Sequence, residues 1–316
     1  MGSLNKAATP AAVNARRSRA GLILLLSITL LWGCNWPVLK IAVSEIPVFS
    51  FRSICLLIGV AGMFFVCRLE GKPWRLPRAD ILPCFWVSLV TITGWNVAST
   101  FGLLHMAPGR ASILAFTMPL WAALMAVPML KERMSTTRIV GLILGLAGMA
   151  MLILPDLAHL AVDPLGPIFM VVAAIMWALG TVGFKLHRWN APITTVTAWQ
   201  FVFGVVPVIA GAFIVDNGSS LANVTWHGWL ALTYASVVCT VYCYWAWFRI
   251  VEIYPATVAA IGTLGIPVVG VFSSAAVLGE PIGLTEIAAL ALVLGALVTV
   301  LILPNLQRRT VPAIGR

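Results

Sequence analysis

Ten stretches of about twenty mostly apolar residues follow one another along this chain, with only short loops between them. A helix of that length crosses the hydrocarbon core of a lipid bilayer. The pattern therefore predicts an all-α integral membrane fold with ten transmembrane helices. Polar loops, prolines and charges mark their ends, and the expected spans are 20–41, 46–67, 80–101, 107–129, 136–155, 164–185, 191–214, 226–248, 255–277 and 282–303.

The composition excludes a soluble domain. Hydrophobic residues make up 61% of the chain and charged residues 9%, whereas soluble domains carry about 25% charged residues. Little of the 316 residues is left outside the spans, so we expect one compact domain in the bilayer. The basic cluster before the first span is typical of a signal peptide, but no small-residue cleavage site follows it, which favours an uncleaved first helix.

The basic residues predict the orientation of the chain. A net charge of +10 would suggest nucleic-acid binding in a soluble protein, but here these residues stand in short loops, as the positive-inside pattern requires. With the N-terminus in the cytoplasm, 17 of the 20 Lys and Arg residues fall on the cytoplasmic side. The three exceptions are Lys40, Arg52 and Arg110. We therefore expect cytoplasmic tails at 1–19 and 304–316.

Two residue pairs recur after nearly the same interval, which indicates an internal duplication. They are Trp32 with Lys40, repeated as Trp177 with Lys185, and Pro119 with Glu132, repeated as Pro267 with Glu280. The first pair recurs after 145 positions and the second after 148. Each half, 20–155 and 164–303, holds five spans, so the second half enters the membrane inverted. Inverted repeats of this kind support alternating access to a site at the midplane.

The run from Trp32 to Pro37, followed by Lys40, resembles the opening helix of the drug/metabolite transporter superfamily. The segment from Pro119 to Glu132, with its second copy, is similar to the EamA-type members. That resemblance implies ten spans in two five-helix repeats, in a bacterial inner membrane. It also implies export of small molecules, and the overall pattern is most similar to bacterial aromatic amino-acid exporters.

Polar and aromatic side chains in the middle of the spans are the candidate substrate-binding residues, because polar groups are costly in a bilayer and aromatic walls hold flat or cationic groups. The alternatives are hydrogen bonds between helices for the amides and an interfacial belt for the aromatic residues. The candidates are Trp32, Asn35, Trp36, Trp95, Asn96, Trp177, Gln200 and Tyr242.

Four further residues are candidates for gating or coupling. Pro119 and Pro267 are expected to kink their spans. Lys40 can attract a carboxylate or close the outer mouth, or its stem can simply extend to the headgroups. His105 can carry a coupling proton or make an interfacial hydrogen bond. Because no Asp or Glu falls at mid-membrane, facilitated diffusion is favoured, with His105 keeping proton exchange open.

These features predict a secondary transporter that exports amino acids or similar small amphipathic metabolites, with aromatic amino acids as the sharpest hypothesis. A drug or broad metabolite exporter is the alternative within the family, and a membrane transferase is the alternative from another class. No transferase motif, P-loop, metal-ligand spacing or cofactor motif is found, so we expect no enzyme activity and no cofactor. The small residues Gly141, Gly145 and Gly148 predict close packing of the fifth span, either internally or in a homodimer.

Overall fold

A computed structural model of the protein describes residues 10–105, 111, 114–153, 164–216, 221–278 and 283–303. In these residues the chain is helical, and no strand occurs. The first half contains α1 (Pro10–Glu45), α2 (Val48–Leu69), α3 (Arg78–Ser88), η1 (Leu89–Gly94), α4 (Trp95–His105), α6 (Met118–Leu130) and α7 (Thr136–Ile153). The second half contains α9 (Leu165–Leu186), α10 (Ile193–Val215), α11 (Trp226–Thr233), η3 (Tyr234–Tyr242), α12 (Cys243–Ile253), α13 (Ala256–Gly262), α14 (Gly265–Leu278), α15 (Leu284–Leu297) and η4 (Val298–Ile302).

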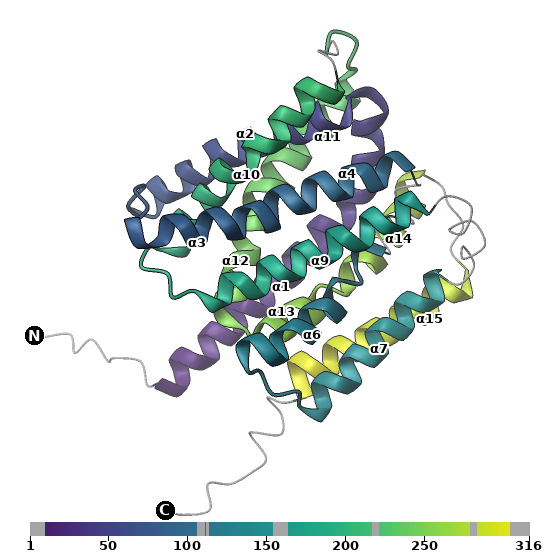
Figure 1. The fold of residues 1–316 in the computed structure, drawn as a ribbon. Helices are drawn as coiled ribbons and strands as arrows, with labels where there is room; N and C mark the ends of the chain where they lie inside the picture. The colour runs from purple at the N-terminus through teal and green to yellow at the C-terminus, as the bar shows by residue number, and fades with distance from the viewer. Residues whose placement is uncertain are drawn as a thin grey trace, which may run out of the picture.

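The described helices form a ten-span bundle (Figure 1). Seven helical stretches of at least 18 residues and three shorter apolar helices are apolar enough to lie in a bilayer. The fourth span is one exception, because its helix α6 begins at Met118 rather than at 107. The other bounds agree with the expected spans to within about five residues, except at the N-terminus. There α1 begins at Pro10, so residues 10–19 of the expected tail are helical, as their alanines and arginines favour.

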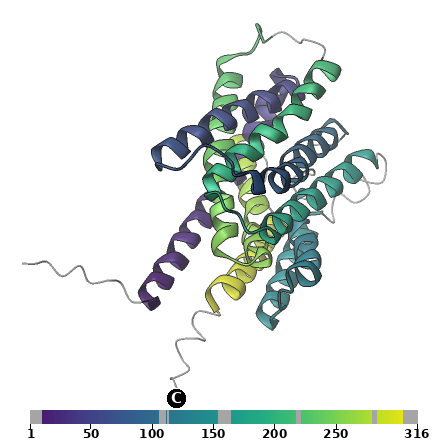
Figure 2. The same cartoon turned by 60° about the vertical axis from the view of Figure 1, so that its left-hand side comes forward.

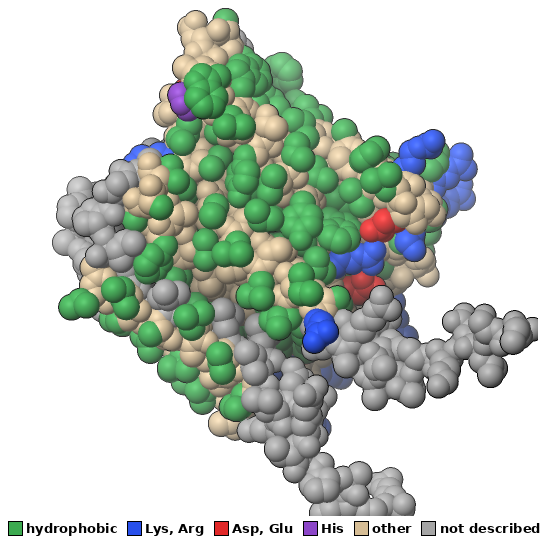
Figure 3. All heavy atoms as spheres, turned by 180° about the vertical axis from the view of Figure 1, so that it is seen from behind, with side chains coloured by type: hydrophobic (Ala, Val, Ile, Leu, Met, Phe, Trp, Pro, Cys, Tyr) green, Lys and Arg blue, Asp and Glu red, His purple; other side chains and the backbone are tan. Residues whose placement is uncertain are grey.

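Both ends of the described chain lie at the same end of the bundle (Figures 1 and 2). We call this end, which also holds Glu70 and Asp80, the base. The opposite end, which holds Glu45 and Asp216, is the rim. Seen from behind, hydrophobic side chains are spread over the whole face, and the visible Lys and Arg side chains gather mainly toward the base (Figure 3). That surface suits a bilayer as solvent.

Each span packs mainly on spans of the other half. Helix α2 pairs with α10, and α7 pairs with α15. Helix α1 packs on α12 and α14, while its counterpart α9 packs on α4 and α6. The two halves are thus interleaved about a pseudo-twofold axis, as inverted repeats are.

The fifth span uses its small residues for this internal packing. A Cβ at Gly141 would overlap Val300, and one at Gly145 would overlap Leu264. One at Gly148 would lie 3.0 Å from the Ala289 carbonyl oxygen. The small-residue face of α7 is therefore occupied by α15, η4 and the turn between α13 and α14.

The proline in the first span does not break its helix. Helix α1 runs through Pro37, although proline leaves the carbonyl four residues earlier without its amide donor. That carbonyl belongs to Gly33, and the Ser273 hydroxyl of α14 is shared between it, at 3.3 Å, and the Gly270 carbonyl, at 3.0 Å. A neighbouring span thus satisfies the freed backbone group, as the apolar surroundings demand.

Candidate functional site

A cavity of about 90 Å³ lies between the two halves, bounded by the first, second, third, fourth, sixth and eighth spans. Its wall is mostly aromatic or apolar, with a few polar groups, as small-molecule sites are. The lining residues are Trp32, Asn35, Trp36, Leu39, Arg52, Cys55, Trp95, Phe116, Met118, Trp177, Ala235, Cys239, Thr240 and Tyr244. None of these lining residues is Asp, Glu or His.

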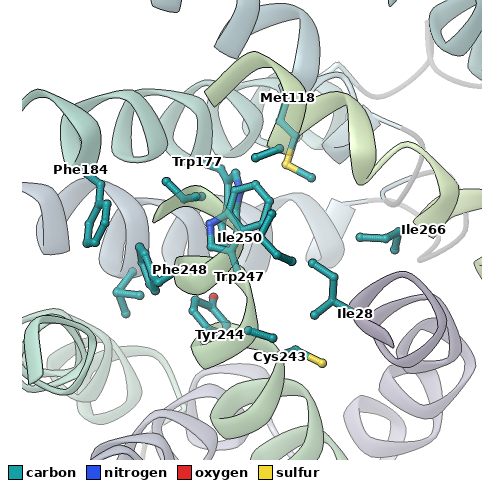
Figure 4. Close-up of a cluster of buried hydrophobic side chains, with 14 of the residues drawn as sticks. Ile28, Met118, Trp177, Phe184, Cys243, Tyr244, Trp247, Phe248, Ile250 and Ile266 are labelled. Carbon is teal, nitrogen blue, oxygen red and sulfur yellow. The ribbon is translucent and has the colours of Figure 1, made fainter. Parts of the chain in front are cut away.

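Four rings close the cavity on the side of the base. Trp32 and Trp177 have ring centroids 5.8 Å apart, and each lies within 5.7 Å of the Tyr244 centroid. Trp247 packs beneath them, 5.7 Å from Trp177 and 1% exposed. Figure 4 shows Trp177, Tyr244 and Trp247 together in this buried cluster. On α1 the other cavity residues lie nearer the rim than Trp32, so the cavity is on the rim side of these rings.

Five of the expected binding residues line this cavity, and they are Trp32, Asn35, Trp36, Trp95 and Trp177. The Trp32 indole N–H donates to the Cys239 carbonyl at 3.0 Å. The Asn35 Oδ1 is buried without a hydrogen-bond partner among the described residues. Asn35 thus offers an unused acceptor to whatever enters the cavity.

The other three expected binding residues do not line the cavity. Asn96 donates to the Ile92 carbonyl of its own helix at 2.7 Å. The Tyr242 hydroxyl pairs with the Ser27 hydroxyl at 2.8 Å. Gln200 is fully buried in α10, and its amide nitrogen and oxygen have no partner among the described residues.

The tyrosine at the cavity is Tyr244 rather than Tyr242 because the preceding segment is a π-helix. Segment η3 spans Tyr234–Tyr242, and its wider turns rotate the residues after it relative to an α-helix. Segment η1 begins at Leu89 in the third span, 145 positions before η3 begins in the eighth. These two π-helices, η1 and η3, therefore stand at equivalent positions of the repeat.

The two candidate gating prolines stand where their spans are broken. Pro119 is the second residue of α6 and Pro267 the third of α14, positions where the missing N–H costs nothing. A turn precedes each helix, and in each turn a threonine hydroxyl donates at 2.7 Å to the carbonyl three residues earlier. These threonines are Thr117 and Thr263.

Lys40 and His105 lie away from the cavity lining. Lys40 is exposed near the rim end of α1, and His105 is exposed at the rim end of α4. Arg110 and Glu280 are outside the described residues. In the described part of the chain, no three His, Cys, Asp or Glu residues come close enough together to hold a metal ion.

Arg52 is a cavity residue that the charge pattern assigned to the outer side of the membrane. It is the fifth residue of α2 and lines the cavity. Its Nε is buried without a hydrogen-bond partner among the described residues. The available signal in the sequence was its position: it interrupts an apolar span rather than a loop, and charges inside spans mark functional sites.

Acidic residues join spans of opposite halves at both ends of the bundle. At the rim, Glu45 accepts from the Thr225 amide at 2.7 Å and from its hydroxyl at 2.9 Å. At the base, Asp80 accepts from the Asn190 and Ala191 amides at 2.9 and 2.8 Å, and its other oxygen lies 3.0 Å from His187 Nε2. With the repeat interval of 145, Glu45 is equivalent to Asn190 and Asp80 to Thr225. The same contact is therefore made at both ends, but the acid stands on the first span at the rim and on the third span at the base.

A second pair of acids ties α2 to α10 at both ends. At the rim, Asp216 accepts from the amide and hydroxyl of Ser50 at 2.6 and 2.8 Å. At the base, Glu70 accepts from the Thr194 hydroxyl at 2.7 Å and from Arg249 at 3.1 Å. Partial burial raises the pKa of the Glu70 carboxyl, but the Thr194 hydrogen bond and the Arg249 charge outweigh it, so its pKa lies below the ordinary value.

Glu132 makes a third contact of this kind at the base. Its Oε1 accepts from the Ala256 amide at 2.8 Å, which caps the start of α13. Its Oε2 lies 3.5 Å from Arg138. The acid that ends α6 thus holds the fourth span against the ninth, away from the cavity.

The repeat is asymmetric at the cavity itself. The position equivalent to Asn35 is Gly180, where a Cβ would overlap Thr91 of η1. The sixth span therefore approaches the third too closely to carry a side chain there. The polar side chains of the cavity include Asn35 and Arg52 from the first and second spans and Thr240 and Tyr244 from the eighth, and none comes from the position equivalent to Asn35.

Comparison with known proteins places this arrangement among transporters. A profile of the EamA-like transporter family matches residues 19–154 and again residues 164–302. The uncharacterized transporter YoaV of Bacillus subtilis (strain 168) is 25% identical over 249 residues, covering 78% of this chain and 85% of the relative. A protein of Escherichia coli (strain K12) named a probable amino-acid metabolite efflux pump is 25% identical over 292 residues, covering 90% and 95%.

A solved crystal structure shares the fold. It superposes with a TM-score of 0.75 and 18% sequence identity, covering 91% of this chain and 99% of the other. At that identity the likeness concerns the fold alone.

Proposed function

The chain belongs to the EamA-like transporter family, and from this premise we propose that it exports small amphipathic metabolites, amino acids above all. Members of this family are transporters rather than enzymes, which sets the transferase alternative aside. The protein is a multi-pass membrane protein. We place it in the inner membrane of a bacterium with the base, and so both termini, in the cytoplasm.

The cavity between the inverted halves is the observation that supports this proposal. Its aromatic wall offers π faces to an apolar side chain or an ammonium group. Asn35 and Arg52 supply polar atoms to its lining. Two related proteins, one from Escherichia coli and one from Salmonella typhimurium, carry the name probable amino-acid metabolite efflux pump. Their name supports the same substrate class.

Cavity size bears on the aromatic hypothesis. About 90 Å³ is less than the roughly 150 Å³ of an engineered cavity that binds benzene. A small aliphatic amino acid therefore needs less rearrangement than an aromatic one. Aromatic amino acids remain substrates in this proposal if the cluster of Trp32, Trp177, Tyr244 and Trp247 opens during the cycle.

Facilitated diffusion is the coupling mode we propose. A coupled proton needs a titratable group at the site, and the described lining contains no carboxylate or imidazole. If transport is coupled to protons, His105 at the rim end of α4 is the residue that we propose to carry them.

The test is transport by the purified protein in liposomes. Radiolabelled alanine, leucine, phenylalanine and tryptophan are compared with a cationic dye, with and without a pH gradient. We expect amino-acid flux that the gradient leaves unchanged. Dye flux without any amino-acid flux would instead identify a drug exporter, and flux that follows the gradient would restore proton coupling.

A further inference from the structure

Arg52 is a partly buried cation whose Nε is fully buried, and the described protein leaves it without a counter-charge. No ion pair or hydrogen bond joins it to a described residue, and the centroid of the Phe51 ring lies 5.8 Å from its Cζ. Glu45 and Asp216 lie at its end of the bundle and are engaged elsewhere, Glu45 with Thr225 and Asp216 with Ser50.

The position of Arg52 argues against a merely structural role. Arginine can extend to the lipid headgroups from a span end, but this side chain lines the central cavity and its Nε is buried. A charge inside a bilayer is costly and is kept where it serves a substrate or ion path. Arg52 faces the cavity, so we expect the group that pairs with its charge to belong to a molecule that enters the cavity.

The same cavity also contains an unused acceptor. Asn35 Oδ1 is buried without a partner among the described residues, and Asn35 lines the cavity together with Arg52. A guanidinium is a donor suited to a planar carboxylate, and an amide oxygen accepts from an ammonium group. The two groups together complement the two ends of an α-amino acid.

We infer that Arg52 is the carboxylate-binding residue of this transporter and that it selects substrates with a free carboxylate. This inference rests on the proposed function and narrows it to zwitterionic or anionic substrates. A molecule with a net positive charge would be repelled by the guanidinium, because the described lining contains no acid to offset that repulsion. Because arginine stays protonated in proteins, the selection is expected to hold across the pH range 5 to 9.

The inference is tested with leucine, leucinamide and 4-methylpentanoate in proteoliposomes of the full chain. Leucinamide lacks the free carboxylate, and 4-methylpentanoate lacks the amine. The wild-type protein should move leucine at least about tenfold faster than leucinamide, the scale of a hydrogen bond to a charged group. In Arg52→Gln the leucine flux should fall about tenfold or more and the preference over leucinamide should disappear, whereas Arg52→Lys should keep part of both.

Arg75→Gln is the matched control, since Arg75 is exposed in the turn between α2 and α3 and the same substitution there should leave the fluxes unchanged. Thermal unfolding followed by tryptophan fluorescence checks the fold. Removing an unpaired buried charge removes a desolvation cost, so Arg52→Met should melt no lower than the wild type. If the glutamine variant fails to fold, Arg52→Lys and Arg52→Met carry the same test, and equal transport of leucine and leucinamide by the wild type would still overturn the inference.

Two failures would be distinguishable. If the wild type moves no amino acid at all, the proposed function and this inference fall together. If it moves leucine but Arg52→Gln does so equally well, or the wild type moves leucinamide as fast as leucine, the assignment of Arg52 is overturned and the proposed function stands.

Discussion

At the scale of single residues, Asn35 and Trp95 line the cavity while Lys185 lies near the base end of α9. Asn35→Ala removes an unused acceptor, and Trp95→Ala removes a ring 5.1 Å from Trp177. We therefore expect each variant to reduce amino-acid flux in proteoliposomes by about tenfold. Lys185→Ala is the comparison and should lose far less. Equal losses in all three, at equal reconstitution levels, would mean that the cavity is not the transport path.

Glu70 gives a second prediction, which concerns stability and pH. Its carboxylate accepts hydrogen bonds from Thr194, Trp245 and Arg249 at the base. Because its folded-state pKa is lowered, the ionised form stabilises the folded protein above the unfolded-state value near 4.3. That stabilisation is lost as the pH falls through this value toward the lower folded-state pKa.

Glu70→Gln should therefore lower the melting temperature at pH 7, by an amount corresponding to about 1 kcal/mol. The difference between variant and wild type should shrink as the pH is lowered from 6 to 3. Melting curves in detergent across that range measure it. A difference that stays constant down to pH 3 would show that the Glu70 charge does not stabilise the fold.

At the scale of the helices, the sequence predicted the spans closely and the site only in part. Span ends follow from runs of apolar residues, which the bilayer thickness requires. Tyr242 was chosen over Tyr244 because it lies further from the end of the span, and the sequence contains no signal for the π-helix η3 that precedes Tyr244. Arg52 was grouped with the loop charges because its environment depends on spans far away in the sequence.

The acid contacts at the ends of the helices were also beyond sequence reasoning. Glu132 contacts Arg138, six residues away, but it also caps α13, which begins 124 residues further along the chain. The partners of Asp80 and Glu45 are more than 100 residues away. Only the packing of the two halves brings such residues together, so no local pattern marks them.

The small-residue face of α7 gives a prediction at this scale. Gly145→Leu would place a bulky side chain against Leu264, and overpacking typically costs about 1–3 kcal/mol. We expect a lower melting temperature with no change in oligomeric state. Ile143→Leu is the control, since Ile143 is 60% exposed on the same helix. If Gly145→Leu instead changed the size of the particle in gel filtration, the face would belong to a homodimer.

At the scale of the whole molecule, the four-ring cluster and the Glu132 contact both lie toward the base from the cavity, so the structure is closed on that side. Spans four and nine carry the paired breaks at Thr117 and Thr263. At the base they meet through Glu132 and the Ala256 amide. A transporter with inverted halves needs such a contact to be broken in the opposite state, and weakening it should shift the population toward that state.

Glu132→Ala is therefore expected to increase access to the cavity from the base. Cys239 lines the cavity, so a variant that keeps only this cysteine reports access through labelling by a membrane-impermeant thiol reagent. Labelling from the base side should become faster in Glu132→Ala, and labelling from the rim side slower. Glu252→Ala is the control, because Glu252 is an exposed acid at the same end that pairs with Arg249 within α12. If Glu132→Ala left both labelling rates unchanged, the contact between α6 and α13 would not control access to the cavity.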